Sequence, residues 1–158
     1  MFSSPRTLGL TIDELVKVTV NNFLPTVFVN YAGKLDAALA TLRAAVPGAT
    51  FDSALLDLAD LASVRAAAED ILARCPRIDV LVNNAGVMAC PLMRTADGLE
   101  MQFGTNHVGH FLLTARLMPA LRAAAPSRIV NLSSAGHKFG AMNLDDPNYE
   151  QRDYNKWV

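Results

Sequence analysis

The sequence has no excess of charge of either sign and no long apolar run. Its 158 residues carry 14 Lys and Arg against 15 Asp and Glu, for a formal net charge of -1. This balance excludes the basic surface expected of a nucleic-acid-binding domain or of a protein held on an anionic membrane. No apolar run reaches the roughly 18 residues of a membrane span, and the first ten residues lack the apolar core of a signal peptide.

Cysteine and histidine are scarce as well. Cys75 and Cys90 have neither a metal-type nor a redox-type spacing, which predicts two free thiols in a reducing compartment and therefore a cytoplasmic protein. His107 and His110 lie three residues apart and would share one helix face. Two histidines alone do not make a metal site, so we predict no bound metal.

Glycine is rare at the start of the chain, where Gly9 and Gly33 are the only two in the first 33 residues. Residues 16–20 alternate as a strand does, residues 26–30 form a second apolar strand, and only residues 21–25 separate them. A parallel crossover needs about a dozen residues. These two strands are therefore not expected to be parallel neighbours, and residues 1–25 are predicted to form an atypical N-terminal segment.

The rest of the chain alternates between apolar strands and helical runs. Strands are predicted over residues 50–56, 78–82 and 128–132, while helical spacing covers residues 34–46, 61–73 and about 96–125, with Asp60 as an N-cap before the second run. Strands that are apolar on both faces are typical of a parallel sheet covered by helices on both sides. The sequence therefore predicts an α/β, Rossmann-like doubly wound fold, with ligands beyond the carboxyl ends of the strands.

Several motifs follow these strand ends in order. They are Asp57-Leu58, NNAG at residues 83–86, TADGLEMQFGTNHVGHFLLT at residues 95–114 and RIVNLSS at residues 128–134. This ordered set resembles the short-chain dehydrogenase/reductase family, close to its retinol-dehydrogenase-like branch. The resemblance covers roughly residues 26–158 and implies a partial NAD(P)-binding domain. It also implies oxidoreductase ancestry, with a small lipophilic alcohol or carbonyl compound as the substrate.

The resemblance places the adenosine half of the cofactor beside two strand ends. Asp57, with Leu58, follows an apolar strand, where its carboxylate can accept a hydrogen bond from an exocyclic amine. The family position implies an adenine contact, and the alternative is a capping or solvated Asp. The resemblance also implies a turn beside the adenosine ribose, formed by Asn83, Asn84, Ala85 and Gly86. The alternative is a turn with a purely structural role.

Two further positions match the family's catalytic residues. Asn106 lies inside an apolar helix, where its side chain competes for backbone hydrogen bonds. In the family the matching Asn distorts the helix and holds a water in a proton relay. Ser134 ends a predicted buried strand, where a hydroxyl can donate to a substrate carbonyl, and it matches the family's catalytic serine.

The family's remaining catalytic pair is not matched. The family places a Tyr, its general acid/base, four residues before a Lys that lowers the pKa of the Tyr and binds the nicotinamide ribose. Tyr154 precedes Lys156 by only two residues, and the fourth residue after Tyr149 is Asp153. Two side chains that are two residues apart on a helix point to different faces. Tyr154 and Lys156 are therefore not this pair, and Asn106 and Ser134 are expected to be vestigial.

These departures predict a truncated, catalytically inactive fragment or pseudoenzyme. In the family, a glycine-rich loop and the helix after it hold the pyrophosphate of the cofactor. This loop with its helix and the C-terminal catalytic part are both expected to be missing. NAD or NADP should therefore bind weakly or not at all. Asn30 and Tyr31, after the second strand, provide neither the acid nor the Arg that distinguishes NAD from NADP. The alternative is a non-catalytic binding or interaction protein that reuses the half-fold.

The expected loss of the C-terminal part, which in the family covers the sheet, is also predicted to lower stability. The apolar side chains of the long helix, namely Phe111, Leu112, Leu113 and Leu117, are expected to be partly uncovered, and the last strand to be an open edge. Exposed apolar patches and open strand edges both favour association. The sequence therefore predicts marginal stability with possible self-association.

Overall fold

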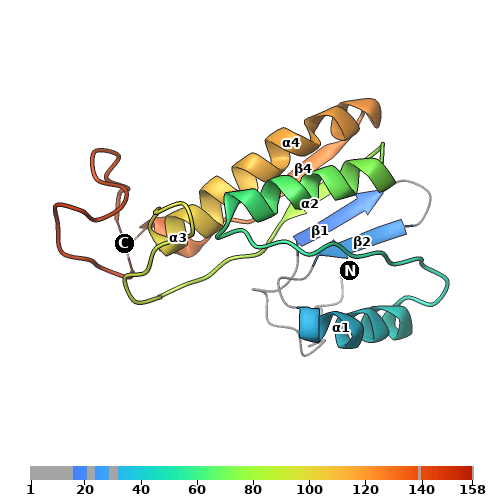
Figure 1. Ribbon diagram of the computed structural model, residues 1–158, viewed down its shortest axis with the longest axis horizontal. Helices are drawn as coiled ribbons and strands as arrows, with labels where there is room; N and C mark the ends of the chain where they lie inside the picture. The colour runs from blue at the N-terminus through green and yellow to red at the C-terminus, as the bar shows by residue number, and fades with distance from the viewer. Residues whose placement is uncertain (1–15, 21–23, 29–31, 139, 158) are drawn as a thin grey trace.

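The computed structural model describes residues 16–20, 24–28, 32–138 and 140–157. The predicted N-terminal segment therefore lies largely outside the described residues, as do Asn30 and Tyr31. Within the described ranges, no helix is both long enough and apolar enough to cross a membrane. The described elements form one sheet with helices packed against it (Figure 1).

The described strands form a four-stranded sheet in the order β2-β1-β3-β4. β3 (Val80–Asn83) and β4 (Arg128–Asn131) are parallel, as predicted. β1 (Val16–Val20) is antiparallel both to β2 (Leu24–Phe28) and to β3. The prediction that the first two strands are not parallel neighbours is confirmed, because a three-residue connection closes a hairpin and cannot carry a crossover. β2 runs in the same direction as β3 and β4, but the antiparallel β1 lies between them, so the sheet is not parallel throughout.

The predicted strand over residues 50–56 is wrong. This segment forms no strand, and only Asp52 and Leu55 take part in isolated bridges. The apolar residues of this segment fill the core without a strand, because Ala54, Leu56 and Leu58 are 4–6% exposed while the residues between them are exposed. An extended segment with every second side chain in the core gives the same period-two pattern as a strand without a hydrogen-bonded ladder.

The predicted helices form with small shifts at their ends. α1 spans Ala32–Ala45 and α2 spans Leu61–Arg74. The Asp60 side chain caps α2 as predicted, since its Oδ1 accepts from the backbone N–H groups of Ala62 at 2.8 Å and Ser63 at 3.3 Å. The last helical run is divided into the short α3 (Met101–Phe103), the π-helical segment η2 (Gly104–Gly109), and α4 (His110–Ala123).

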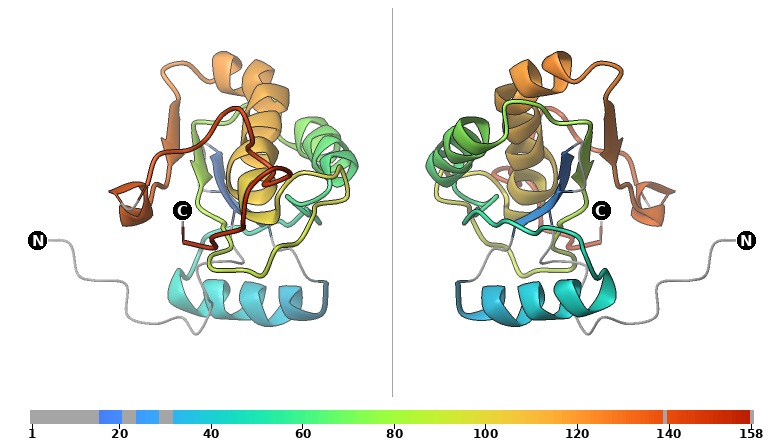
Figure 2. Two further views of the ribbon diagram at one scale, coloured as in Figure 1. Left: turned by 90° about the vertical axis from the view of Figure 1, so that its left-hand side faces the viewer. Right: turned by 90° about the vertical axis from the view of Figure 1, so that its right-hand side faces the viewer.

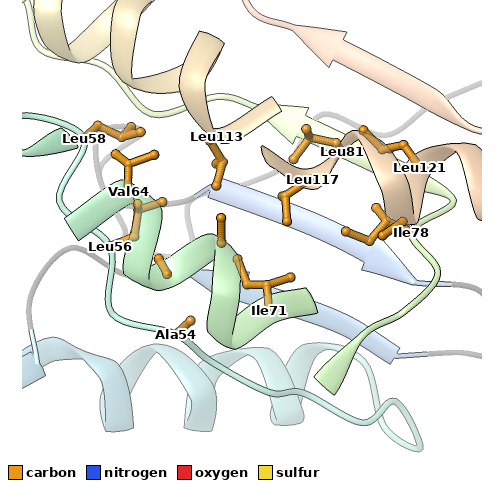
Figure 3. Packing of buried hydrophobic residues seen from close by; sticks show 13 residues of the cluster. Ala54, Leu56, Leu58, Val64, Ile71, Ile78, Leu81, Leu113, Leu117 and Leu121 are labelled. Atoms are coloured by element: carbon orange, nitrogen blue, oxygen red, sulfur yellow. The ribbon is translucent and has the colours of Figure 1, made fainter. Parts of the chain in front are cut away.

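The core lies between the sheet and the pair of helices α2 and α4, which lie side by side on one face of the sheet (Figures 1 and 2). Figure 3 shows how the apolar side chains of the two helices meet over β3. The largest completely buried side chains are Ile71, Ile78, Leu81, Leu113, Leu117, Leu121 and Val64.

The predicted exposure of the long helix is only partly correct. Leu113 and Leu117 are 0% exposed, because they lie on the stripe of α4 that faces α2 and β3. Leu112 is half-buried, and Phe111 is 69% exposed on a different side of the helix. The fold therefore buries the inner stripe of α4 and leaves the Phe111 side without cover from the described residues.

β4 is an open edge, as predicted. It ends the described sheet and pairs with β3 alone, and all four of its residues are exposed. Ile129 and Val130 are 40% and 44% exposed, although both are of the residue types that sheets usually bury.

The core stripe of α4 should determine stability. We expect Leu117→Ala to lower the free energy of unfolding by about 2–5 kcal/mol, because it removes completely buried methyl groups and leaves a cavity. Leu144→Ala is the matched control, since Leu144 is 78% exposed and its loss should change stability by about 0.5 kcal/mol or less. Urea unfolding followed by circular dichroism measures both variants. Equal midpoints for the two would show that the helix pair is not the core.

Candidate functional site

A cavity of about 1240 Å³ opens beyond the carboxyl ends of β3 and β4. Its walls come from the turns after these two strands, from η2 and the start of α4, and from the segment 140–157. Six of the predicted site residues line this cavity, namely Asn83, Asn84, Ala85, Gly86, Asn106 and Ser134. This position agrees with the rule that open α/β sheets bind ligands outside the carboxyl ends of their strands.

Asp57 and Leu58 are not among the residues that line the cavity. The Asp57 carboxylate is exposed, and its Oδ1 accepts a hydrogen bond from the backbone N–H of Ala59 at 2.9 Å. Leu58 is 4% exposed and belongs to the core. The structure therefore places Asp57 in a local turn on the surface, and its contact with an adenine ring stays a prediction.

Asn106 lies in the middle of η2 (Gly104–Gly109), where the helix widens to a π-helical turn. The distortion expected at this residue is therefore present. Both amide atoms of the Asn106 side chain are hydrogen-bonded to the backbone. Its Oδ1 accepts from the backbone N–H of Val87 at 2.8 Å, and its Nδ2 donates to the backbone oxygen of Val87 at 2.8 Å. Asn106 thus holds the turn after β3 against the helix.

Close backbone contacts fix η2 in this position. A Cβ atom on Gly109 would lie 2.5 Å from the backbone oxygen of Leu58, and one on Gly104 would lie 2.4 Å from a methyl carbon of Thr95. Both distances are shorter than any ordinary carbon contact, so η2 can approach its neighbours only because these positions have no side chain. The glycines of the motif thereby bring the π-helical turn against the segment that leads into α2.

Ser134 lies in the turn after β4 and is exposed at the cavity. Its Oγ accepts a hydrogen bond from the backbone N–H of Gly136 at 3.1 Å. This bond uses a lone pair and leaves the hydroxyl proton available. Ser134 can therefore still donate to a carbonyl oxygen in the cavity.

Tyr154 is not among the residues that line the cavity. Its hydroxyl lies 3.0 Å from the backbone oxygen of Cys90 and 3.2 Å from Oε1 of Glu100, and it accepts from Nε2 of Gln102 at 3.0 Å. Burial is the largest cause that raises the pKa of Tyr154, and the nearby Glu100 carboxylate raises it further. A general acid/base working near pH 7 needs the opposite shift. That Tyr154 and Lys156 are not the catalytic pair stays a prediction.

The segment after residue 140 is held against the site by polar contacts. Asn148 Oδ1 accepts from the backbone N–H of Glu100 at 2.9 Å, and Arg94 donates to the backbone oxygen of Asn148. The Asp146 carboxylate accepts from the backbone N–H groups of Glu150 at 2.7 Å and Gln151 at 3.1 Å. These two hydrogen bonds lower the pKa of Asp146, and the bond from Glu150 has the larger effect. The segment therefore closes one side of the cavity.

The sequence analysis missed Glu100 and underrated His110. Glu100 is 3% exposed and caps α3, since its carboxylate accepts from the backbone N–H groups of Gln102 at 3.0 Å and Phe103 at 2.7 Å. His110 is 6% exposed and lines the cavity. Its spacing from the buried Leu113 and Leu117 was the available signal, because it places the ring on the core stripe of α4. Across the described ranges, no group of three or more His, Cys, Asp or Glu side chains is arranged to hold a metal ion.

The Asn106 clamp can be tested by hydrogen exchange. We expect Asn106→Ala to speed exchange of the Val87 amide by about two- to tenfold, because the variant removes its acceptor at 2.8 Å. His107→Ala is the control, since the neighbouring His107 ring stacks on Phe103 at a centroid distance of 5.6 Å and is not bonded to Val87. Unchanged Val87 exchange in Asn106→Ala would contradict the clamp.

The chain is similar to curated retinol dehydrogenases. The chain is 58% identical over 101 residues to retinol dehydrogenase 14 of Homo sapiens, which covers 64% of this chain and 30% of the relative. It is 49% identical over 122 residues to retinol dehydrogenase 13 of Homo sapiens, covering 77% of this chain and 37% of the relative. The chain thus spans only about a third of the length of these curated relatives.

Solved structures give the same picture. An uncharacterised protein from Mycobacterium paratuberculosis superposes with a TM-score of 0.70 at 41% identity, covering 84% of this chain and 44% of that one. A metagenomic short-chain oxidoreductase in complex with NADP superposes with a TM-score of 0.57 at 33% identity, covering 70% of this chain and 51% of that one. The family model described as short chain dehydrogenase matches residues 13–144. Because this match spans most of the sequence, the chain belongs to the short-chain dehydrogenase family.

Proposed function

We propose that this chain is a non-catalytic member of an oxidoreductase family, one that keeps a binding cavity but performs no hydride transfer by itself. The whole protein of this type would act on an alcohol/carbonyl pair with NAD or NADP. Relatives named retinol dehydrogenases favour a small lipophilic substrate for it. Ser134 and Asn106 are then vestiges of the catalytic machinery, Asn106 surviving in its structural role.

One observation carries this proposal, namely the position of the Tyr154 hydroxyl. A hydride transfer to or from an alcohol needs a proton donor or acceptor at the oxygen that Ser134 would bind. The Tyr154 hydroxyl instead contacts the backbone oxygen of Cys90 and the side chains of Glu100 and Gln102, and Tyr154 is not among the residues that line the cavity. Its raised pKa keeps the phenol protonated and makes it a poor base. Ser134 alone can bind an oxygen but cannot carry the proton.

We expect purified residues 1–158 to oxidise neither retinol nor other lipophilic alcohols with NAD or NADP. Loss of general acid/base catalysis alone costs typically about 10² to 10⁴ in rate. Reduced-cofactor absorbance measures the reaction, and Ser134→Ala is the control that should match the wild-type chain. Turnover that follows the protein through purification and falls in Ser134→Ala would overturn the proposal.

The cofactor itself should bind weakly. β1 and β2 are joined as an antiparallel hairpin by three residues, so this connection does not provide the glycine loop and helix N-terminus that cradle a pyrophosphate. The turn at residues 83–86 remains at the cavity and supports an adenosine half-site at most.

Comparing the affinities of NAD and AMP tests whether the chain lacks a pyrophosphate-binding loop. We expect NAD and NADP to bind no more than about tenfold more tightly than AMP, because the second phosphate and the nicotinamide gain few contacts. Isothermal titration of the three nucleotides into the same sample measures this ratio. Saturable dinucleotide binding at micromolar concentration, with AMP far weaker, would be incompatible with the hairpin.

The alternative function, a binding or interaction protein, is favoured by the exposed β4. An open strand edge with apolar side chains pairs readily with another strand. A second copy of the chain would supply such a strand in any pure sample.

We expect the chain to self-associate as its concentration rises, and Ile129→Lys to reduce this because charge on an edge strand disfavours pairing. Leu144→Lys is the control, since Leu144 is more exposed, at 78%, and lies outside the sheet. Sedimentation velocity over a concentration series follows the oligomer. A monomer at all concentrations would remove the support for this alternative.

A further inference from the structure

Large apolar side chains that the fold leaves exposed gather at the cavity beyond β3 and β4. Five of them line it with exposed fractions of 51–74%, namely Met88, Phe111, Leu132, Met142 and Trp157. They come from the turn after β3, from α4, from the end of β4 and from the segment 140–157. Exposed apolar residues that are scattered singly need no explanation, whereas a group that meets at one cavity marks a binding site.

The size of the cavity agrees with an extended apolar ligand. Its volume of about 1240 Å³ is larger than the roughly 300–1,000 Å³ of most small-molecule pockets. The free energy gained by covering apolar side chains grows with the area that is covered. A long hydrocarbon chain can cover side chains from several of these segments at once, which a compact polar ligand cannot do.

The acidic and basic side chains that line the cavity are not balanced. Besides the histidines they are Glu100, Arg152 and Lys156. Glu100 is almost completely buried, and its two oxygens accept from backbone N–H groups at the start of α3. Arg152 is paired with the Asp146 carboxylate, whose Oδ2 lies 3.7 Å from Nε. The charges of Glu100 and Arg152 are therefore already compensated within the protein.

Lys156 differs from both. Within the described ranges, no carboxylate forms an ion pair with it. Its ammonium group lies 5.3 Å from the centroid of the Trp157 ring, within the range of a cation–π contact. Its backbone oxygen accepts from Nε2 of Gln102 at 3.2 Å, which attaches the residue to α3. Lys156 therefore presents a positive charge with three N–H donors beside an apolar ring at the cavity.

We infer that the cavity binds a long-chain carboxylate, whose hydrocarbon chain covers the exposed apolar side chains and whose carboxylate accepts hydrogen bonds from Lys156. A long-chain alcohol covers the same side chains but brings no charge to the ammonium group. A long-chain amine places a second positive charge beside it. The inference rests on the proposed function, in which the cavity binds a ligand without turning it over, and it names the chemical class of that ligand.

The chain contains its own reporter for this ligand. Trp157 is the only tryptophan of the sequence and lines the cavity, so the intrinsic fluorescence of the full chain reports on this site. The probes are dodecanoate, dodecanol and dodecylamine, which share one hydrocarbon chain and differ in the head group alone. Each is titrated below its micelle concentration, and isothermal titration of the same samples gives an affinity that does not depend on the fluorescence of Trp157.

We expect dodecanoate to change the emission of Trp157 saturably and to bind about tenfold more tightly than dodecanol, as expected for one charge-assisted hydrogen bond. Dodecylamine should bind more weakly than dodecanol, because its ammonium group is repelled by Lys156. The order of the three affinities separates the contribution of the head group from that of the hydrocarbon chain, which is the same in all three.

A pair of lysine variants assigns the preference to Lys156. In Lys156→Gln the affinities for dodecanoate and dodecanol should become equal within about twofold, because the charged donor is lost. Lys138→Gln is the matched control, since Lys138 is exposed, is not among the residues that line the cavity and loses the same charge. It should keep the tenfold preference. Each ratio compares two ligands on one variant, so a change in the apolar walls affects both ligands alike.

Three results would overturn the inference. They are equal affinities of the wild-type chain for dodecanoate and dodecanol, a preference for dodecanoate that survives in Lys156→Gln, and heat of dodecanoate binding without any change in Trp157 emission. The comparison of head groups uses the wild-type chain alone, so the inference stays testable even when Lys156→Gln fails to fold. Turnover of NAD or NADP would instead overturn the proposed function, and it would leave the measured order of the three affinities unchanged.

Discussion

The π-helical turn η2 is the constraint on which the rest of the site depends. It contacts both the turn after β3, through Asn106, and the segment that precedes α2, through Gly109. Because Asn106 holds Val87 by two hydrogen bonds, the direction of the chain after β3 is fixed relative to α4. The start of α4 in turn places His110 and Thr114 at the cavity. A shift of η2 would therefore move both the turn after β3 and the start of α4.

The pattern of the sequence predicted the elements that are built by local chemistry. Asp60 predicted the start of α2, since a carboxylate before an apolar helical run satisfies the first N–H groups. The parallel pairing of β3 and β4 followed from apolar strands separated by a long helix. The ordered motifs predicted which strand ends meet, and six of the eight predicted site residues line one cavity.

What failed has a physical reason in each case. Residues 50–56 alternate because Ala54 and Leu56 fill the core, and periodicity alone cannot separate such a segment from a hydrogen-bonded strand. Glu100 was missed because its burial depends on contacts with Tyr154 and Asn148, more than 40 residues away in the sequence, that no local pattern encodes.

Family membership and chemistry separate at a single hydroxyl group. The strand ends, the glycines and the π-helical turn are requirements of packing, and a chain can keep all of them while it lacks a proton donor. In this chain the Tyr154 hydroxyl is part of the network that joins Glu100 and Gln102 to the segment 140–157. That role favours a protonated phenol with a raised pKa, whereas catalysis would need one that gives up its proton readily. The structural role of Tyr154 supports the proposal that this residue is not the general acid/base.

The two sides of the cavity are held by different kinds of interaction. The floor belongs to β3 and α4, whose apolar side chains Leu81, Leu113 and Leu117 are completely buried. The wall made by residues 140–157 is attached mainly through hydrogen bonds to Glu100, Gln102 and Arg94. Segments with few buried apolar contacts open locally at a smaller cost in free energy than the core does. The wall is therefore expected to open at a smaller cost in free energy than the floor.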